Sequence, residues 1–123
     1  MIENSIEQEK SLTLHTCTGL ISAEDIEKEI RLLYKNGPTD NHLWDLTNAD
    51  LSSLDNIDIR KLAELPVEIV PNRKGRKTAL VAGTDLEFGL SRMYATHSEY
   101  QGPLAEIRVF RSIEEAKKWI DEN

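Results

Sequence analysis

The sequence has one cysteine, no long apolar run and few basic residues, and each shortage excludes a class of protein. The single Cys17 cannot form an internal disulfide, so nothing indicates an oxidising compartment. The longest purely apolar run, residues 79–82, is far shorter than the roughly 20 residues of a membrane-spanning helix. Residues 1–7 lack the basic start and the apolar stretch of a signal peptide. We therefore expect a cytoplasmic protein without stable membrane association.

The charge balance argues against nucleic acid as a partner. Of the 123 residues, 15 are Lys or Arg and 22 are Asp or Glu, so the net charge is -7. Nonspecific binding to nucleic acid or to an acidic membrane requires a basic face that displaces counterions.

With 39% hydrophobic and 30% charged residues, the composition is ordinary for a globular chain and too apolar for intrinsic disorder. We expect a single domain over residues 1–123.

Hydrophobic periodicity predicts alternating strands and helices. Alternation at period two predicts strands over residues 11–17 and 105–110, shorter patterns predict strands over 2–6 and 42–46, and an apolar run predicts one over 77–83. Helical stripes follow Ser22, Asp55, Thr84 and Ser112, and Pro66 is expected to bend or end the second helix. This order predicts an α/β fold with a mixed, mostly parallel five-stranded sheet flanked by four helices.

The same periodicity predicts which side chains face the core and which residues start the helices. Ser22 with Asp25, and Ser112 with Glu115, have the spacing of capping boxes. In the strand over 11–17, one face is expected to hold Leu12, Leu14 and Thr16. In the helix over 85–98, the buried stripe is expected to hold Leu86, Leu90, Met93, Tyr94 and His97.

Local motifs for catalysis or metal binding are missing from the sequence. His15, His42 and His97 lie 27 and 55 residues apart, and none is paired with Cys or another His at ligand spacing, so no metal or cofactor is expected. Residues 75–78 resemble a phosphate-binding loop but precede a strand, and Ser91 lies inside a helical pattern rather than on a nucleophile elbow. Cys17 has no cation near it in sequence, which favours inert packing. A non-catalytic protein is preferred, and an enzyme assembled only on folding is the alternative.

Residues 73–77 form a concentrated basic segment, with four cations in five residues. Such a run at the entrance of a strand is typical of a solvated loop that opposes aggregation. The functional alternative is a contact with an anion or with an acidic partner.

Polar residues follow three of the predicted parallel strands. In open α/β sheets, ligands and partners meet the protein beyond the carboxyl ends of the strands. The segments 45–53, 83–85 and 111–112 are expected to converge there as a rim for a small anion or a partner loop. The rim residues are Asp45, Thr47, Ser52, Ser53, Thr84 and Asp85. The simpler interpretation is that Thr84 and Ser112 cap helices and that Asp85 complements a helix dipole.

A set of short strings supports a family resemblance over residues 10–122. These strings are Leu43-Trp44-Asp45-Leu46, Ala79-Leu80-Val81-Ala82, Phe88-Gly89-Leu90-Ser91-Arg92-Met93-Tyr94, and Val109-Phe110-Arg111-Ser112 with Glu115, Ala116 and Trp119. Together they resemble the SpoIIAA-like family of small STAS-fold proteins, which includes bacterial anti-sigma-factor antagonists and cytoplasmic domains of sulphate transporters. The resemblance implies a regulatory or protein-protein interaction module that binds a protein partner.

The resemblance also implies control by phosphorylation. In the antagonists, a serine within Asp-Ser-Ser-Gly at the start of the second helix is phosphorylated by a partner kinase. Here the corresponding string, residues 50–55, has an inserted Leu51 and no glycine after Ser53. Ser52 and Ser53 are the implied phosphorylation sites, and Asp55 and Asp58 would repel a phosphate of charge about -2.

A pocket and a dimer contact complete the hypotheses. The STAS fold resembles the lipid-exchange fold of the CRAL-TRIO group, which implies a small apolar or lipid-like ligand in a pocket lined by Trp44, Phe88, Met93 and Tyr94. Plain core packing is the competing interpretation, because Met93 and Tyr94 fit the buried stripe. In the preferred module, Arg92 adds a cation to the rim if it faces the same way. Phe88 then supplies an exposed apolar contact in a homodimer.

Overall fold

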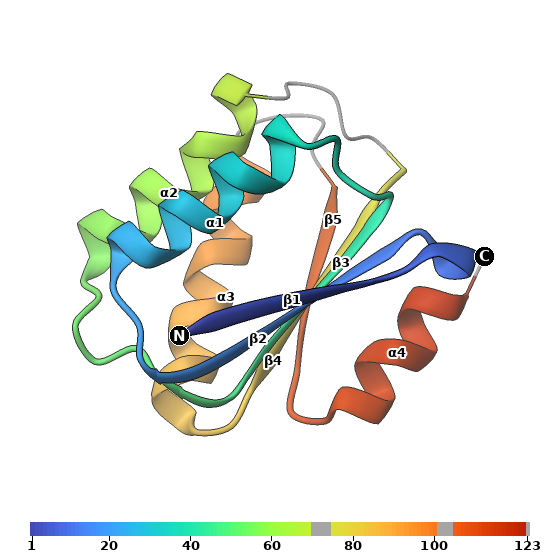
Figure 1. Ribbon diagram of the computed structural model, residues 1–123. Helices are drawn as coiled ribbons and strands as arrows, with labels where there is room; N and C mark the ends of the chain where they lie inside the picture. The colour runs from blue at the N-terminus through green and yellow to red at the C-terminus, as the bar shows by residue number, and fades with distance from the viewer. Residues whose placement is uncertain (70–74, 101–104, 123) are drawn as a thin grey trace.

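The strands of the sheet lie in the order in which they occur along the chain, β1-β2-β3-β4-β5 (Figure 1). The computed structural model describes residues 1–69, 75–100 and 105–122. The strands are β1 (Ile2–Glu7), β2 (Leu12–Leu20), β3 (Asn41–Asp50), β4 (Lys77–Ala82) and β5 (Glu106–Phe110), and the helices are α1 (Ala23–Lys35), α2 (Asn56–Ile69), α3 (Asp85–Glu99) and α4 (Ile113–Asp121). β1 is antiparallel to β2, and the other neighbouring pairs are parallel. The predicted mixed, mostly parallel sheet is confirmed.

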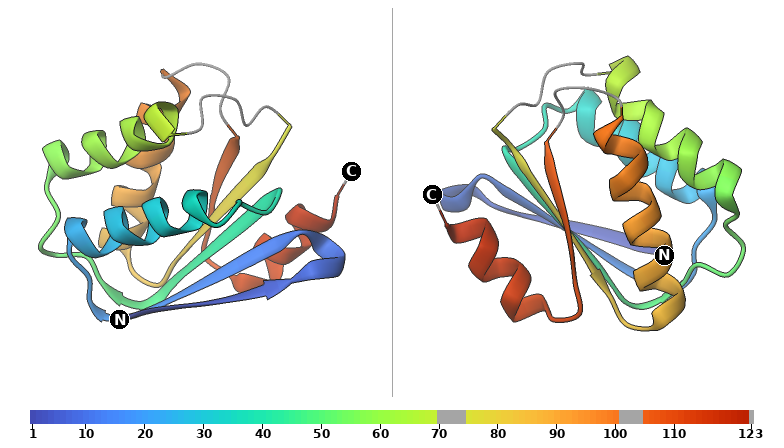
Figure 2. Two further views of the ribbon diagram at one scale, coloured as in Figure 1. Left: turned by 45° about the horizontal axis from the view of Figure 1, so that its top comes forward. Right: turned by 180° about the vertical axis from the view of Figure 1, so that it is seen from behind.

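The helices divide unequally between the two faces of the sheet. α1, α2 and α3 cover one face, and α4 lies alone on the other (Figure 2). The larger core cluster lies under the three helices and includes Ile30, Trp44 and Leu80. The smaller cluster packs Leu43 and Val81, among others, against α4. The larger part of the core is therefore between the sheet and the three-helix layer.

The alternation in β2 predicts the more deeply buried face wrongly. Leu12 and Leu14 do share a face, the one that packs on α4. The opposite face is the one under the three helices, and it holds Thr13, His15 and Cys17, all at most 2% exposed. Because helices cover this strand on both sides, a polar residue in the alternation does not mark a solvated face. β2 therefore buries a histidine.

β3 is longer than its apolar pattern predicts. The structure extends it from residue 46 to Asp50, because β2 continues to Leu20 and provides a partner for the polar segment. The register shifts between Thr16 and Thr18 of β2, as it does at a β-bulge. A paired neighbour, rather than local hydrophobicity, makes residues 47–50 a strand.

The helix starts are predicted better than the buried stripes and the helix ends. Ser22 and Asp25 form the predicted capping box at α1, and Ser112 accepts a hydrogen bond from the amide of Glu115 at α4. Pro66 does not end α2, which continues to Ile69. None of the helices in the described part of the chain is both long and apolar enough to span a membrane.

The stripe predicted for α3 holds only in part. Leu90 is buried, and Met93 and Tyr94 are partly buried against the same cluster. Leu86 is 49% exposed, whereas its neighbour Glu87 is 3% exposed. Glu87 accepts a hydrogen bond from the Thr84 hydroxyl at 2.7 Å, which compensates for its burial. The first turn of α3 thus turns an acid inward and a leucine outward.

The described part of the basic segment makes contacts within the protein. Arg76 forms an ion pair with Asp40. Lys77 donates hydrogen bonds to the carbonyl oxygens of Trp119, at 2.8 Å, and Glu122, and its Nζ lies 5.2 Å from the centre of the Trp119 ring. Residues 73 and 74 lie outside the described residues. Lys77 therefore holds the C-terminal end of α4 against the sheet, as cations at helix C-termini do.

Replacing Lys77 by methionine is expected to lower the free energy of unfolding by about 1–3 kcal/mol, because two charge-assisted hydrogen bonds are lost. The methionine keeps most of the apolar stem, so the change reports on the ammonium group. Urea denaturation measures the effect. Lys118→Met on the exposed face of the same helix is the control and should change stability by less than about 0.5 kcal/mol. Equal losses in the two variants would contradict a capping role for Lys77.

Candidate functional site

The carboxyl ends of β2, β3, β4 and β5 lie at the same edge of the sheet because these strands are parallel (Figure 1). We call this the strand-end edge, formed by Leu20 and by residues 47–57, 83–88 and 111–112. Two contacts join its loops directly: Gly83 lies against the backbone of Thr47, and Arg111 donates a hydrogen bond to Asp85 at 2.8 Å. The three predicted segments are therefore neighbours.

Gly83 is fixed at this edge by the closeness of two strands. A Cβ added to Gly83 would lie 2.3 Å from the carbonyl oxygen of Thr47 and 2.9 Å from its Cα. No side chain fits at such distances, so only glycine allows the two segments to come this close just after Leu46 and Ala82, the last paired residues of β3 and β4. The glycine sets how far apart the following loops begin.

Asp45 and Thr47, two predicted rim residues, interact with each other. The Asp45 carboxylate accepts hydrogen bonds from the Thr47 amide at 3.1 Å and from the Thr47 hydroxyl at 2.6 Å. Both residues lie at the register shift opposite β2. A bulge removes an amide from the ladder, and here Asp45 supplies the acceptor. Their visible role is to stabilise the bulge that precedes the edge.

Thr84 occupies the N-cap position of α3 but does not cap it with its side chain. Its hydroxyl instead donates to the buried carboxylate of Glu87. The prediction of a capping hydroxyl is therefore wrong, because the inward turn of Glu87 requires a donor close by. Ser112 does cap α4, through the amide of Glu115.

Two arginines flank Phe88 at the start of α3. The guanidinium carbon of Arg111 lies 4.2 Å from the centre of the Phe88 ring, and that of Arg92 lies 6.0 Å from it. Arg92 thus lies beside Phe88, a residue of the strand-end edge. Phe88 is half-buried rather than exposed, since Arg111 covers part of its ring. The Asp85 side chain is 96% exposed, so its ion pair with Arg111 contributes little to stability.

Ser52 and Ser53 lie in an exposed turn before α2. The Ser52 amide donates to the Asp50 carboxylate at 2.9 Å, and hydrogen bonds from Ser52 lower the pKa of Asp50. The Ser53 hydroxyl donates to the carbonyl oxygen of Ile21 at 3.1 Å. Asp55 and Asp58 accept hydrogen bonds from each other's amides and so occupy the start of α2. Two carboxylates stand where a phosphate would gain most from the helix N-terminus.

Exposed apolar side chains at this edge were missed by the sequence analysis. Leu20 is 64% exposed, Ile57 is 53% exposed and Leu86 is 49% exposed. Leu20 ends β2, and the other two lie in the first turns of α2 and α3. The sequence does carry a signal for this exposure. Ile57 and Leu86 each lie next to the acidic residues that start a helix, before the first buried residue of that helix. This signal becomes meaningful only when the fold brings the three positions to one edge.

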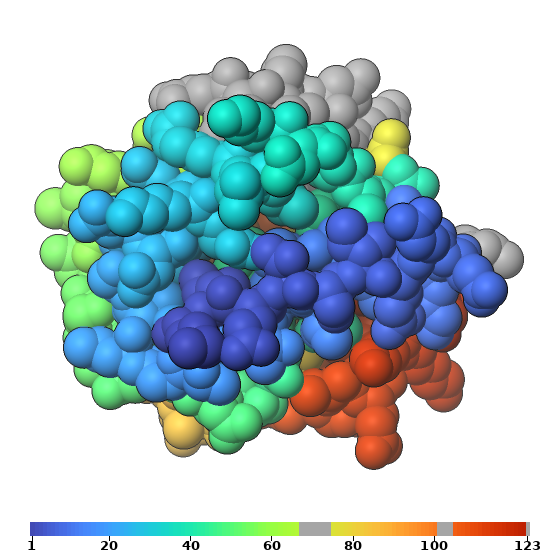
Figure 3. Space-filling view, in the orientation of Figure 1, coloured from blue at the N-terminus to red at the C-terminus, as the bar shows by residue number. Residues whose placement is uncertain are grey.

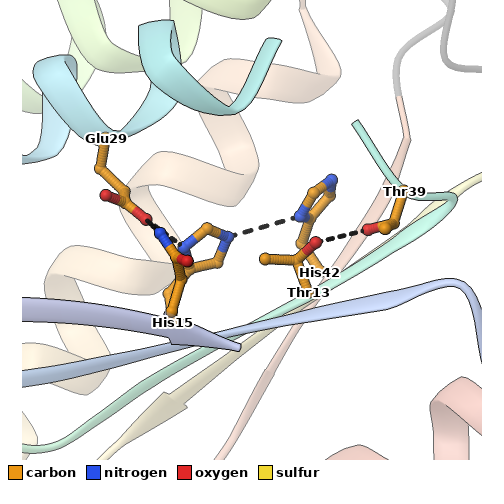
Figure 4. Close-up of polar contacts among 6 residues, drawn as sticks. Thr13, His15, Glu29, Thr39 and His42 are labelled. Carbon is orange, nitrogen blue, oxygen red and sulfur yellow. Dashed lines mark hydrogen bonds and ion pairs between the residues drawn. The ribbon is translucent and has the colours of Figure 1, made fainter. Parts of the chain in front are cut away.

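A row of buried polar side chains lies between the sheet and α1 (Figure 4). Glu29 of α1 lies 2.8 Å from Nδ1 of His15, and Nε2 of His15 lies 3.4 Å from Nδ1 of His42. Asn4 of β1, the outer strand beside α1 (Figure 3), donates to the same Glu29 oxygen at 2.9 Å. His15 therefore interacts with two other side chains. Its partners are 14 and 27 residues away, so no local pattern announces them.

Burial dominates the ionisation of this cluster. It lowers the pKa of His15, against the opposing effects of the Glu29 hydrogen bond and charge. Burial also raises the pKa of Cys17 to about 12, consistent with an inert thiol. The described residues contain no group of three or more metal-ligating side chains.

A cavity of about 70 Å³ lies between the sheet and the three helices. Trp44 and Tyr94 line it, as predicted for an apolar pocket, but Phe88 and Met93 do not. Ligand pockets for drug-sized molecules are roughly 300–1,000 Å³. The four predicted residues thus do not share one lipid-sized pocket in this structure.

Comparison with known proteins identifies the fold. No protein-family model matches the chain, and no curated protein matches it. Among solved structures, an uncharacterized DUF3478-family protein from Shewanella loihica PV-4 is 20% identical, with a TM-score of 0.57 over 98% of this chain and 92% of that one. The anti-sigma factor antagonist SpoIIAA, in its unphosphorylated form, is 13% identical with a TM-score of 0.57 over both whole chains. The chain therefore has the SpoIIAA-like fold.

Proposed function

We propose that this chain is a non-catalytic, cytoplasmic protein-interaction module whose contact surface is the strand-end edge. The observation that supports it most is the exposure of Leu20, Ile57 and Leu86 at one edge. Protein interfaces combine a central apolar area with a polar rim. The apolar residues here stand among the polar groups of the same loops, so the edge has both components.

The charges at the edge favour a partner with basic residues. Asp50, Asp55 and Asp58 lie within or next to the exposed loops and outnumber the two cations there, of which Arg111 already pairs with Asp85; the whole chain has a net charge of -7. Complementary charge speeds encounter and disfavours acidic partners. SpoIIAA is by its name an antagonist of an anti-sigma factor, and we infer a regulatory protein partner for this chain as well.

Leu86→Asp and Ile57→Asp test the proposal. Each variant replaces an exposed apolar residue of the proposed contact by a charge, so binding should weaken at least about tenfold, as for a hot-spot residue. The measurement captures binding proteins from the native host with the wild type as bait, followed by affinities with the purified partner. Leu32→Asp is the matched control, since Leu32 is 50% exposed on α1 away from this edge.

The capture experiment has one outcome that supports the proposal and one that contradicts it. A partner retained by the wild type and by Leu32→Asp, but lost by both edge variants, supports the proposal. A partner bound equally by all four proteins, with thermal unfolding showing that all are folded, would place the contact elsewhere.

Phosphorylation of Ser52 or Ser53 stays a prediction of the family resemblance. The exposed turn gives a kinase access to both residues. The Ser53 hydroxyl would have to leave the Ile21 carbonyl, and a phosphate there would stand beside Asp55. Repulsion between these groups means that a modification would change the surface of the edge rather than reinforce α2.

Two further hypotheses concern a homodimer and an apolar ligand. A homodimer through Phe88 stays a prediction, with the contact restricted to the part of the ring that Arg111 leaves open. A lipid-like ligand also stays a prediction, and the cavity of about 70 Å³ favours a smaller molecule. The edge is preferred because three apolar side chains, rather than one, are exposed there.

A further inference from the structure

The cavity between the sheet and α1, α2 and α3 has a mainly apolar lining, in which Thr78, Ser91 and Tyr94 carry hydroxyl groups. Among the described residues, no charged side chain lines it. Ser91 does line it, is 4% exposed, and its hydroxyl oxygen has no hydrogen-bond partner among the described residues. A buried polar group without a partner is uncommon in native proteins and calls for an explanation.

A second cavity continues the first along the same helix. It measures about 40 Å³ and shares four lining residues with the larger one: Ile30, Trp44, Thr78 and Tyr94. Ser98, one heptad after Ser91, lines this second cavity, is 3% exposed, and likewise lacks a hydrogen-bond partner for its hydroxyl. The two serines therefore put two unsatisfied hydroxyls on the inner face of α3, one in each cavity.

Packing alone does not account for these serines. Burying a hydroxyl without a partner destabilises the fold, and alanine at the same positions would remove that cost and favour the helix. A buried group of this kind needs an explanation, and a bound molecule that completes the hydrogen bonding supplies one. The Ser91 hydroxyl is placed to do so from the wall of an apolar cavity.

We propose that this cavity binds a small, neutral, mainly apolar molecule with one hydrogen-bonding group, which pairs with the Ser91 hydroxyl. A charged ligand is disfavoured because the lining offers no opposite charge. The cavity of about 70 Å³ is smaller than the apolar cavity of about 150 Å³ that holds benzene, so a single ring enters only if a lining side chain moves. The half-buried Tyr94, which lines both cavities, has to move for a ring to use the space of both. This inference does not depend on the proposed function at the strand-end edge.

Phenol and benzene form the matched pair of probes, because they differ by one hydroxyl. Binding to the wild-type protein is followed by ¹H–¹⁵N NMR titration of the amides around Trp44 and Leu90. Phenol is expected to bind roughly five- to tenfold more tightly than benzene, the gain of one neutral hydrogen bond. In Ser91→Ala this preference should disappear while benzene binding is kept.

Ser98→Ala is the control, because it removes a hydroxyl from the neighbouring cavity and should keep the preference for phenol. Ser91→Ala should also raise the midpoint of thermal unfolding, which shows that the variant folds and that the hydroxyl was unsatisfied. Equal binding of phenol and benzene to the wild type would overturn the proposal. So would binding of neither probe, which means that the cavity holds only water, or a lower unfolding midpoint in Ser91→Ala.

Discussion

Replacing Gly83 by alanine is expected to lower the free energy of unfolding by at least about 3 kcal/mol. The new Cβ would lie 2.3 Å from the Thr47 carbonyl oxygen and 2.9 Å from the Thr47 Cα, atoms of the backbone that no rotamer change can move. The ends of β3 and β4 would have to separate, which costs ladder hydrogen bonds and packing in both core clusters. Urea denaturation followed by circular dichroism measures the loss.

Gly89→Ala is the matched control for this change. A Cβ at Gly89 meets no atom within 4 Å outside its own helix, and Gly89 lies in the middle of α3. Alanine there should stabilise the protein by about 0.5–1 kcal/mol, because glycine is a poor helix former. Opposite signs at two glycines six residues apart are the test. A Gly83→Ala protein as stable as the wild type would show that the strands are not so close in solution.

The same substitution has a consequence for the proposed contact surface. The loop that contains Ser52 and Ser53 begins after β3, and the loop that contains Thr84 and Asp85 begins after β4. Gly83 sets the distance between the start of the second loop and Thr47, near the end of β3. A protein that tolerates Gly83→Ala by separating the strands should therefore also bind its partner less well.

Local sequence signals predict the parts of the fold that local interactions decide. The Ser22 capping box and the Ser112 N-cap are examples, since each depends on residues within a few positions of one another. The extension of β3 to Asp50 was missed because it depends on β2, some 30 residues earlier in the chain. The buried face of β2 was missed for a similar reason, because distant helices cover its polar residues.

For the candidate site, too, some features could be predicted from the sequence and others could not. The convergence of the three loops could be predicted, because parallel strands place their carboxyl ends together. The roles of the individual residues could not be predicted. Asp45 pairs with Thr47 and Thr84 donates to Glu87, and these contacts depend on a bulge and on an inward-turned acid. Exposure of Leu86 follows from that same inward turn, so the apolar part of the edge becomes visible only in three dimensions.

Acid is expected to destabilise this protein through His15, beginning near pH 6.5. The His15 imidazole is fully buried, and burial lowers its pKa in the folded state below the ordinary value of about 6.5. Below that pH the unfolded chain binds a proton that the folded protein does not bind. Stability from His15 is therefore complete above about pH 6.5 and is lost as the pH falls, at a rate approaching roughly 1 kcal/mol per pH unit.

The variant His15→Leu isolates the contribution of His15 to the pH dependence of stability. At pH 7.5 the variant should be less stable by about 3 kcal/mol, because the buried Glu29 carboxylate loses its imidazole partner and keeps only Asn4. As the pH falls toward 5, the difference between wild type and variant should shrink, since only the wild type has this histidine to protonate. Urea denaturation at half-unit steps of pH measures both quantities.

Two further variants test whether the pair of His15 and Glu29, rather than His15 alone, accounts for the change in stability. The double change His15→Leu and Glu29→Leu should recover most of the lost stability, because no buried charge is left without a partner. His97→Leu removes a histidine of α3 that lies outside the chain of Glu29, His15 and His42, and it should keep the wild-type slope with pH. A His15→Leu protein with the wild-type slope would assign the acid sensitivity to another group, of which His42, 3.4 Å from His15, would be the first to examine.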